Sequence, residues 1–161
     1  MKILVLGLGN PLLKDDSVGL RVAQEVESII PASPDIEVGL DYWGGLRLME
    51  RMIGFDRAII IDAICTGAPP GTIHLLTPED IPTQRSASVH DVNLTTALKL
   101  GTQAGAHLPQ MTDILLIGVE AADVQTFDES LSAEVEKALP AAVAAVMTAL
   151  DSCEGASTED I

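Results

Sequence analysis

The stretch KILVLGLGNPLLKDDSVG, residues 2–19, decides the fold class. Residues 2–7 form a continuous run of β-branched residues and leucine, which is typical of a strand covered on both faces. After the loop, Val18, Val22 and Val26 recur at helical spacing, which predicts an amphipathic helix. A buried strand, a glycine-containing loop and a helix in this order predict the first unit of an α/β domain.

The rest of the chain continues this alternation of apolar strands and helices. Further strands are predicted at residues 35–42, 57–64, 72–77 and 113–119, and helices at 44–54, 92–105 and 129–150. The most apolar strand, 57–64, is expected at the centre of the sheet, and 72–77 at an edge. Together these elements predict a three-layer α/β sandwich, with a mostly parallel twisted sheet of about five strands and helices on both faces.

The last predicted helix contains a proline and is followed by a polar segment. Ser130 or Ser132 is expected to cap this helix, and Pro140 to kink it or to begin a second segment. Residues 151–161 lack apolar periodicity and are expected to form a disordered tail. The 161 residues thus predict a single α/β domain over residues 1–150 and a tail beyond it.

Composition limits the location and the partners of the protein. The longest apolar runs are far shorter than the roughly 20 residues of a membrane helix, and the run after Met1 is too short for a signal peptide, so a cytoplasmic protein is predicted. The 24 acidic and 9 basic side chains give a net charge of −15, which disfavours nucleic acid and anionic membranes as partners. No exposed apolar face is evident in the pattern, so a monomer is expected.

The two cysteines, Cys65 and Cys153, are expected to be free thiols, as in a reducing compartment. Cys65 is interpreted as a small buried side chain and Cys153 as part of the polar tail. His74 is interpreted as a strand side chain and His107 as a surface loop residue. These four residues are therefore set aside as candidates for the functional site.

The loop after the first strand lies where a dinucleotide-binding loop would, but its residues do not fit that function. Gly7 and Gly9 are in place, whereas Leu12 occupies the third glycine position of the G-x-G-x-x-G motif. Asp15 and Asp16 would compete with a phosphate for the helix N-terminus. Nucleotide binding is therefore the least favoured hypothesis.

One aspartate of the Asp15-Asp16 pair is enough to cap the helix, which leaves the other for a function. In an open α/β sheet, ligands bind beyond the carboxyl ends of the strands. Asp16, Asp62 and His90 are each expected at this edge. Two carboxylates and an imidazole with open coordination positions suit nickel, zinc or manganese, and not copper(I), which prefers thiolates.

Each of these residues also has a structural interpretation. Asp62 can be a hydrogen-bond acceptor at the end of a buried strand, and His90, beside Asp91, can belong to the beginning of a helix. Trp43, the single tryptophan, follows the second strand at the same edge, where packing and substrate contact are equally open.

The blocks ILVLGLGNPLLKDDSVG, GGLRLMERMIGFDRAIIIDAI, PGTIHLL, SVHDVNL and LLIGVE resemble those of the hydrogenase maturation proteases. Members of this family are endopeptidases that process the large subunit of nickel–iron hydrogenases, and the resemblance covers nearly the whole chain. It implies that Asp16, Asp62 and His90 form the catalytic metal site of an aspartyl-type endopeptidase. Asp16 stands where the family often has glutamate, one methylene longer.

The resemblance also implies a substrate and a partner. The segment Asp41, Trp43 and Gly44 stands where many members carry Asp-x-Gly-Thr, and is interpreted as substrate-binding. The expected reaction is a single cut near the C-terminus of the large-subunit precursor after nickel insertion. The precursor itself can supply the nickel, and zinc or cadmium is expected to substitute for it in vitro.

The residues leave the hydrolytic group open. A bound ion can polarise the scissile carbonyl or activate water, and a carboxylate can act as general base. Neither a G-x-S-x-G nor an H-E-x-x-H motif is present in the sequence. The second hypothesis is therefore a non-catalytic checkpoint protein that senses nickel during hydrogenase assembly.

Overall fold

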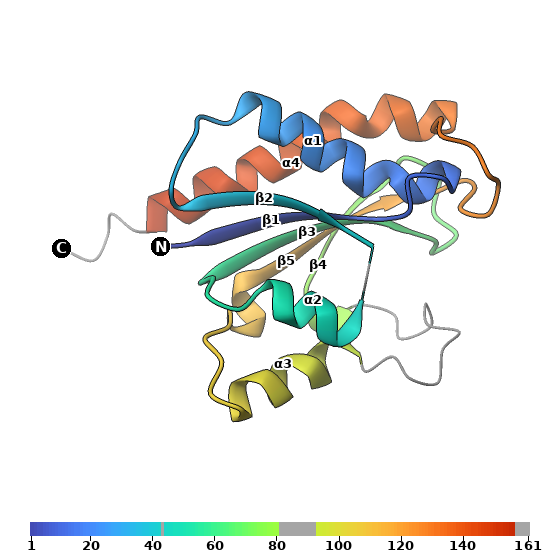
Figure 1. The fold of residues 1–161 in the computed structure, drawn as a ribbon. Helices are drawn as coiled ribbons and strands as arrows, with labels where there is room; N and C mark the ends of the chain where they lie inside the picture. Colours follow the sequence, from blue (N-terminus) through green and yellow to red (C-terminus); the bar gives the residue numbers. More distant parts are fainter. Residues whose placement is uncertain (43, 81–92, 157–161) are drawn as a thin grey trace.

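A computed structural model of the chain describes residues 1–42, 44–80 and 93–156, and its centre is a twisted five-stranded sheet (Figure 1). The strand order is β2-β1-β3-β5-β4, and β4 alone among these strands runs antiparallel to its neighbour. The strands are β1 (Ile3–Leu8), β2 (Ile36–Asp41), β3 (Arg57–Ile64), β4 (Ile73–Leu76) and β5 (Ile114–Glu120). The predicted mostly parallel sheet, with residues 57–64 at its centre and 72–77 at an edge, is confirmed.

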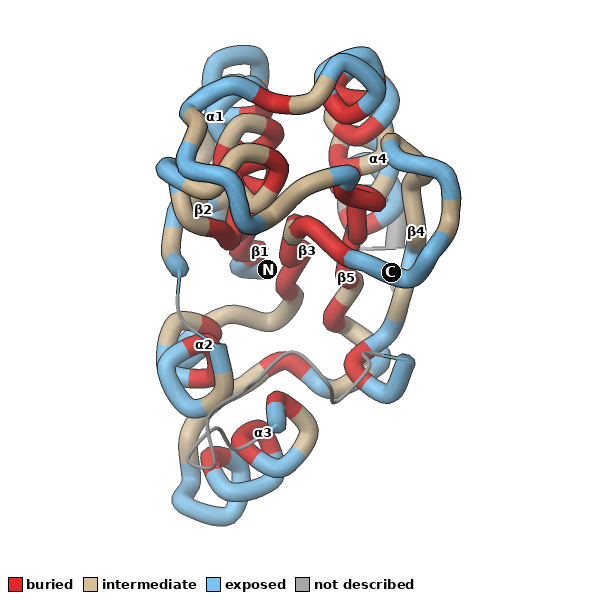
Figure 2. Tube along the Cα trace, turned by 90° about the vertical axis from the view of Figure 1, so that its right-hand side faces the viewer, coloured by how far each residue is buried: buried red, intermediate tan, exposed pale blue. Residues whose placement is uncertain are grey.

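Helices cover both faces of the sheet, so the predicted three layers are also confirmed. Helices α1 (Val18–Ile29) and α4 (Ala133–Ala156) lie on one face, and α2 (Gly45–Arg51) and α3 (Leu94–Gln103) on the other (Figures 1 and 2). Alternate strand residues feed two apolar cores, one under each helix pair. The strands read as continuous apolar runs because both of their faces are buried.

Helix α4 differs from its prediction at both ends and in the middle. It begins at Ala133, directly after Ser132, and continues through Pro140 to Ala156 as a single helix. Pro140 lies on the exposed side, where water can reach the backbone carbonyl that the proline leaves without an amide partner. The predicted second segment is therefore not formed.

The helix extends beyond Leu150 because its buried stripe does. Val146, Leu150 and Cys153 follow one another at helical spacing in the core under α1 and α4. Cys153 is accordingly buried in a helix rather than placed in a polar tail, and Cys65 is exposed rather than buried. Both thiols are free, as predicted.

In the part of the chain that the structure describes, no helix combines the length and hydropathy needed to cross a membrane.

Helix α1 packs directly on the sheet backbone at Gly19. A Cβ on Gly19 would lie 2.3 Å from the carbonyl oxygen of Ile61 and 2.4 Å from that of Leu8. Gly7 makes the reciprocal approach, since its Cβ would lie 2.4 Å from the Gly19 carbonyl oxygen. These glycines therefore serve contact between the helix and the strands.

Gly19→Ala is expected to lower the free energy of unfolding by about 3 kcal/mol, because the added methyl group must push α1 away from β1 and β3. Urea denaturation measures this loss. Gly44→Ala is the matched control, because nothing lies within 4 Å of the added Cβ. Equal midpoints for Gly19→Ala and the wild type would contradict this account of the packing.

Candidate functional site

A cleft of about 420 Å³ opens at the carboxyl ends of β1 and β3. Asp16 and Asp62 both line it, and so do Leu13, Tyr42 and Gly44. This is the sheet edge at which ligands bind in open α/β folds. Two carboxylates from separate elements of the fold thus meet in one cavity.

Asp16 belongs to a 3-10 turn, Lys14–Ser17, that joins the loop after β1 to α1. Its half-buried carboxylate accepts a hydrogen bond from the Asn10 amide, with an N···Oδ2 distance of 2.9 Å. Gly9 has a φ of +148°, and a Cβ there would lie 1.9 Å from the Asp16 carbonyl oxygen. The loop can close on the turn in this way only with glycine at position 9.

Asp62 lies in β3 beside Gly118 of β5 and is half-buried. Its Oδ1 accepts the Ala63 amide at 2.8 Å. The side chain is on the same face of the sheet as Ile60, the face that α2 and α3 cover. Asp62 therefore reaches the cleft from the floor, whereas Asp16 reaches it from the loop after β1.

The other predicted site residues have different positions. Gly44 lines the cleft, whereas Asp41 ends β2, where its Oδ1 accepts the Tyr42 amide and its Oδ2 lies 4.0 Å from Arg51 Nε. Trp43 and His90 lie outside the described residues. Within residues 1–42, 44–80 and 93–156, no three His, Cys, Asp or Glu side chains are grouped to hold a metal. Asp16 and Asp62 supply oxygen donors, which fit a divalent cation that has a further ligand elsewhere.

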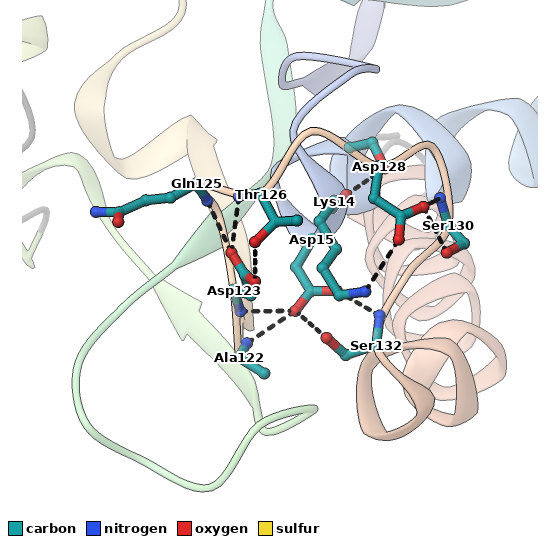
Figure 3. Close-up of polar contacts among 10 residues, drawn as sticks. Lys14, Asp15, Ala122, Asp123, Gln125, Thr126, Asp128, Ser130 and Ser132 are labelled. Atoms are coloured by element: carbon teal, nitrogen blue, oxygen red, sulfur yellow. Dashed lines mark hydrogen bonds and ion pairs between the residues drawn. The ribbon is translucent and has the colours of Figure 1, made fainter.

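Asp15, beside Asp16, has an opposite environment. It is fully buried, and its carboxylate accepts four hydrogen bonds of 2.7–2.9 Å from the amides of Ala122, Asp123 and Ser132 and from the Ser132 hydroxyl (Figure 3). The N-cap of α1 is Ser17, without a side-chain capping bond. The prediction that one aspartate caps α1 is therefore wrong, because Asp15 binds the loop between β5 and α4 instead.

Glu120, which sequence reasoning missed, is a second buried carboxylate at this edge of the sheet. It is 1% exposed and accepts hydrogen bonds from the Thr66 amide, the Thr66 hydroxyl and the Gly67 amide at 2.7–3.0 Å. His74 Nε2 lies 3.1 Å from its Oε2. Burial raises the pKa of Glu120, but the hydrogen bonds from Thr66, Gly67 and His74 outweigh burial and hold the pKa below its usual value. Glu120 thus ties the loop after β3 to β5 and β4.

The lowered pKa makes Glu120 a source of pH-dependent stability. The contribution of its carboxylate is complete above the unfolded pKa near 4.5 and is lost as the pH falls through the lower folded-state pKa. Glu120→Gln is expected to cost about 2 kcal/mol at pH 7, and the difference from the wild type is expected to shrink as the pH falls from about 5 toward 3. Urea titrations at several pH values measure both trends. Glu25→Gln, on the exposed side of α1, is the control, and a constant difference across this range would contradict the account.

The remaining two histidines lie as predicted. His74 is a side chain of the edge strand β4. His107 is an exposed loop residue whose Nε2 lies 2.9 Å from Asp56 Oδ1.

Comparison with known proteins connects this geometry to a family. The family model of the hydrogenase maturation proteases matches residues 43–149. The chain is 30% identical to the hydrogenase 2 maturation protease of Escherichia coli (strain K12) over 152 residues, which cover 91% of each chain. It is 29% identical to the hydrogenase expression/formation protein HupD of Rhizobium leguminosarum bv. viciae, over 94% of this chain and 75% of that protein.

Solved structures agree with these sequence matches. The hydrogenase maturating endopeptidase HybD from E. coli superposes with a TM-score of 0.78 at 30% identity, over 95% of this chain and 94% of that one. The maturation protease HycI from Thermococcus kodakarensis KOD1 shares the fold, with a TM-score of 0.70 at 21% identity over 93% and 92% of the two chains. Sequence and fold lead to the same conclusion: the chain belongs to the hydrogenase maturation protease family and is a peptidase.

Proposed function

We propose that this peptidase removes a C-terminal peptide from the precursor of a nickel–iron hydrogenase large subunit once nickel has been inserted. The observation that supports this function best is the pair Asp16 and Asp62, which reach one cleft from two separate elements. Family membership supports a hydrogenase precursor as the substrate. The pair supports a reaction in which carboxylates engage a metal ion that belongs to that substrate.

In this proposal, Asp16 and Asp62 are ligands to the nickel of the precursor, and His90 is the third. Zinc and cadmium are expected to replace nickel in vitro. When bound, such an ion polarises a peptide carbonyl or lowers the pKa of a water molecule. The Asn10 amide holds the carboxylate of Asp16 on the cleft side of its turn, which lowers the cost of ordering it when the substrate binds.

A second role of the same residues is proton transfer. A carboxylate that lines the cleft and is not engaged by the ion can accept a proton from the attacking water.

The peptide to be cut is proposed to contact the end of β2 and the residues after it, namely Asp41, Tyr42, Trp43 and Gly44. The net charge of −15 favours a basic segment in that peptide. We further propose that the protein acts as a cytoplasmic monomer.

Intact-mass spectrometry of a large-subunit precursor tests this function. The precursor is incubated with the protein after nickel loading and, in parallel, without nickel. Loss of a C-terminal peptide from the loaded sample alone is the expected result. Cleavage of both samples would refute the requirement for nickel, and binding without cleavage would refute proteolysis of this substrate.

A further inference from the structure

The loop between β5 and α4, residues 121–132, exposes a large aromatic side chain. Phe127 is 82% exposed, in a chain with only two phenylalanines, one tyrosine and one tryptophan. The other phenylalanine, Phe55, packs against the core beneath α2 and α3. Phe127 contributes nothing to the core, and with the neighbouring exposed Leu12 it forms a small apolar patch of the kind that contacts other molecules.

Phe127 lies beside the loop whose residue Leu13 lines the cleft. The Asp128 amide donates to the carbonyl of Leu12 at 3.0 Å, and the Lys14 amide donates to the carbonyl of Asp128 at 2.8 Å, so that Leu13 and Asp128 form a parallel bridge. Leu12 directly precedes Leu13, and Phe127 directly precedes Asp128. Because the bridge is parallel, Leu12 and Phe127 lie next to each other. Leu12 is 49% exposed, and Leu13 lines the cleft.

The segment that carries Phe127 is fixed on both sides. Before it, the Asp123 carboxylate accepts the amides of Gln125 and Thr126 and the Thr126 hydroxyl. After it, the Asp128 carboxylate accepts the amide and hydroxyl of Ser130 (Figure 3). A side chain displayed on a segment held this way loses little backbone entropy when a partner binds.

The segment around Phe127 is also acidic. The Thr126 hydroxyl and the amides of Gln125 and Thr126 lower the pKa of Asp123 to about 2. Hydrogen bonds from Ser130 likewise lower the pKa of Asp128. Both groups are charged at neutral pH, as ordinary aspartates are. The Asp128 carboxylate also lies 3.4 Å from Lys14 Nζ. A matching surface would offer an apolar pocket flanked by basic side chains.

We propose that Leu12 and Phe127, together called the apolar rim, dock the hydrogenase large-subunit precursor through such a pocket. This inference rests on the proposed function, because the apolar rim adjoins Leu13, which lines the cleft that would hold the peptide to be cut. A second copy of this chain is the less favoured occupant, since it would bring a net charge of −15 against an equal charge. The apolar rim thus binds the folded body of the substrate, while the cleft binds its C-terminal segment.

Phe127→Ala tests the docking surface. Removal of a central aromatic contact is expected to raise KM for the nickel-loaded precursor, and Kd measured by interferometry, about 30-fold, with kcat changed less than twofold. The thermal midpoint is expected to stay unchanged, because the side chain packs little against its own protein. Phe127→Leu should recover most of the affinity. Leu100→Ala, which removes a 48% exposed side chain on α3, is the control and should leave KM unchanged.

The outcomes separate this inference from the proposed function. Unchanged KM and Kd for Phe127→Ala would overturn the docking surface while cleavage by the wild type stands. A wild-type protein that binds the precursor through Phe127 but does not cut it would overturn the proposed function alone. Sedimentation showing a wild-type dimer that Phe127→Ala converts to monomer would assign the surface to a second copy and overturn the proposal.

Discussion

Asp16→Asn is expected to lower the rate of precursor cleavage by about 100-fold or more while leaving the thermal midpoint within about 2 °C of the wild type. The substitution removes a negative charge from the cleft but keeps an oxygen that can accept the Asn10 amide. The Asp16→Asn protein should therefore keep its fold but lose the carboxylate that is proposed to bind the metal ion. The rate is measured as the loss of precursor mass with time, at saturating nickel-loaded precursor.

Asp62→Asn is expected to lower the rate in the same way, because it also lines the cleft. Asp113→Asn is the control, since Asp113 lies next to the amino end of β5, away from the cleft. Its cleavage rate should equal that of the wild type. Wild-type rates for Asp16→Asn would remove this residue from the proposed site.

Asp15→Asn is expected to produce the opposite result, with a loss of about 3 kcal/mol in the free energy of unfolding. The asparagine side chain places an NH2 group where a carboxylate oxygen now accepts hydrogen bonds. At least one donor from Ala122, Asp123 or Ser132 then loses its acceptor in a fully buried site. For a chain of this length, the thermal midpoint should fall by about 10 °C.

The two adjacent substitutions control each other, because they make the same chemical change one residue apart. Circular dichroism gives the two midpoints, and the cleavage assay gives the two rates. A stable Asp15→Asn protein would show that the four hydrogen bonds contribute little. An unstable Asp16→Asn protein would show that its carboxylate also supports the fold.

The fold was predictable because its elements carry local patterns. The strand at residues 57–64 could be placed at the centre of the sheet from its apolar run, and the order of strands and helices indicated a parallel sheet. The same topology predicted that Asp16 and Asp62 lie at one edge of the sheet, since Asp16 follows the first strand and Asp62 lies near the end of the central strand. Their catalytic roles, and that of His90, stay predictions.

The sequence could not reveal which aspartate of the pair is structural. Asp15 is bound by residues 122, 123 and 132, more than 100 positions away, and no local pattern indicates such partners. Glu120 was missed for a related reason, because its donors at Thr66 and Gly67 belong to another loop. A glutamate that ends an apolar strand at the ligand-binding edge was nevertheless a usable signal.

The pairing of α1 with α4 on one face of the sheet has a consequence for synthesis on the ribosome. Helix α1, which is made early, stays without its packing partner until α4 has emerged, and Asp15 stays without its donors until Ser132 has emerged. Contacts between such distant parts of a chain form late in folding. The turn that carries Asp16 therefore gains its anchor at Asp15 only after Ser132 has left the ribosome.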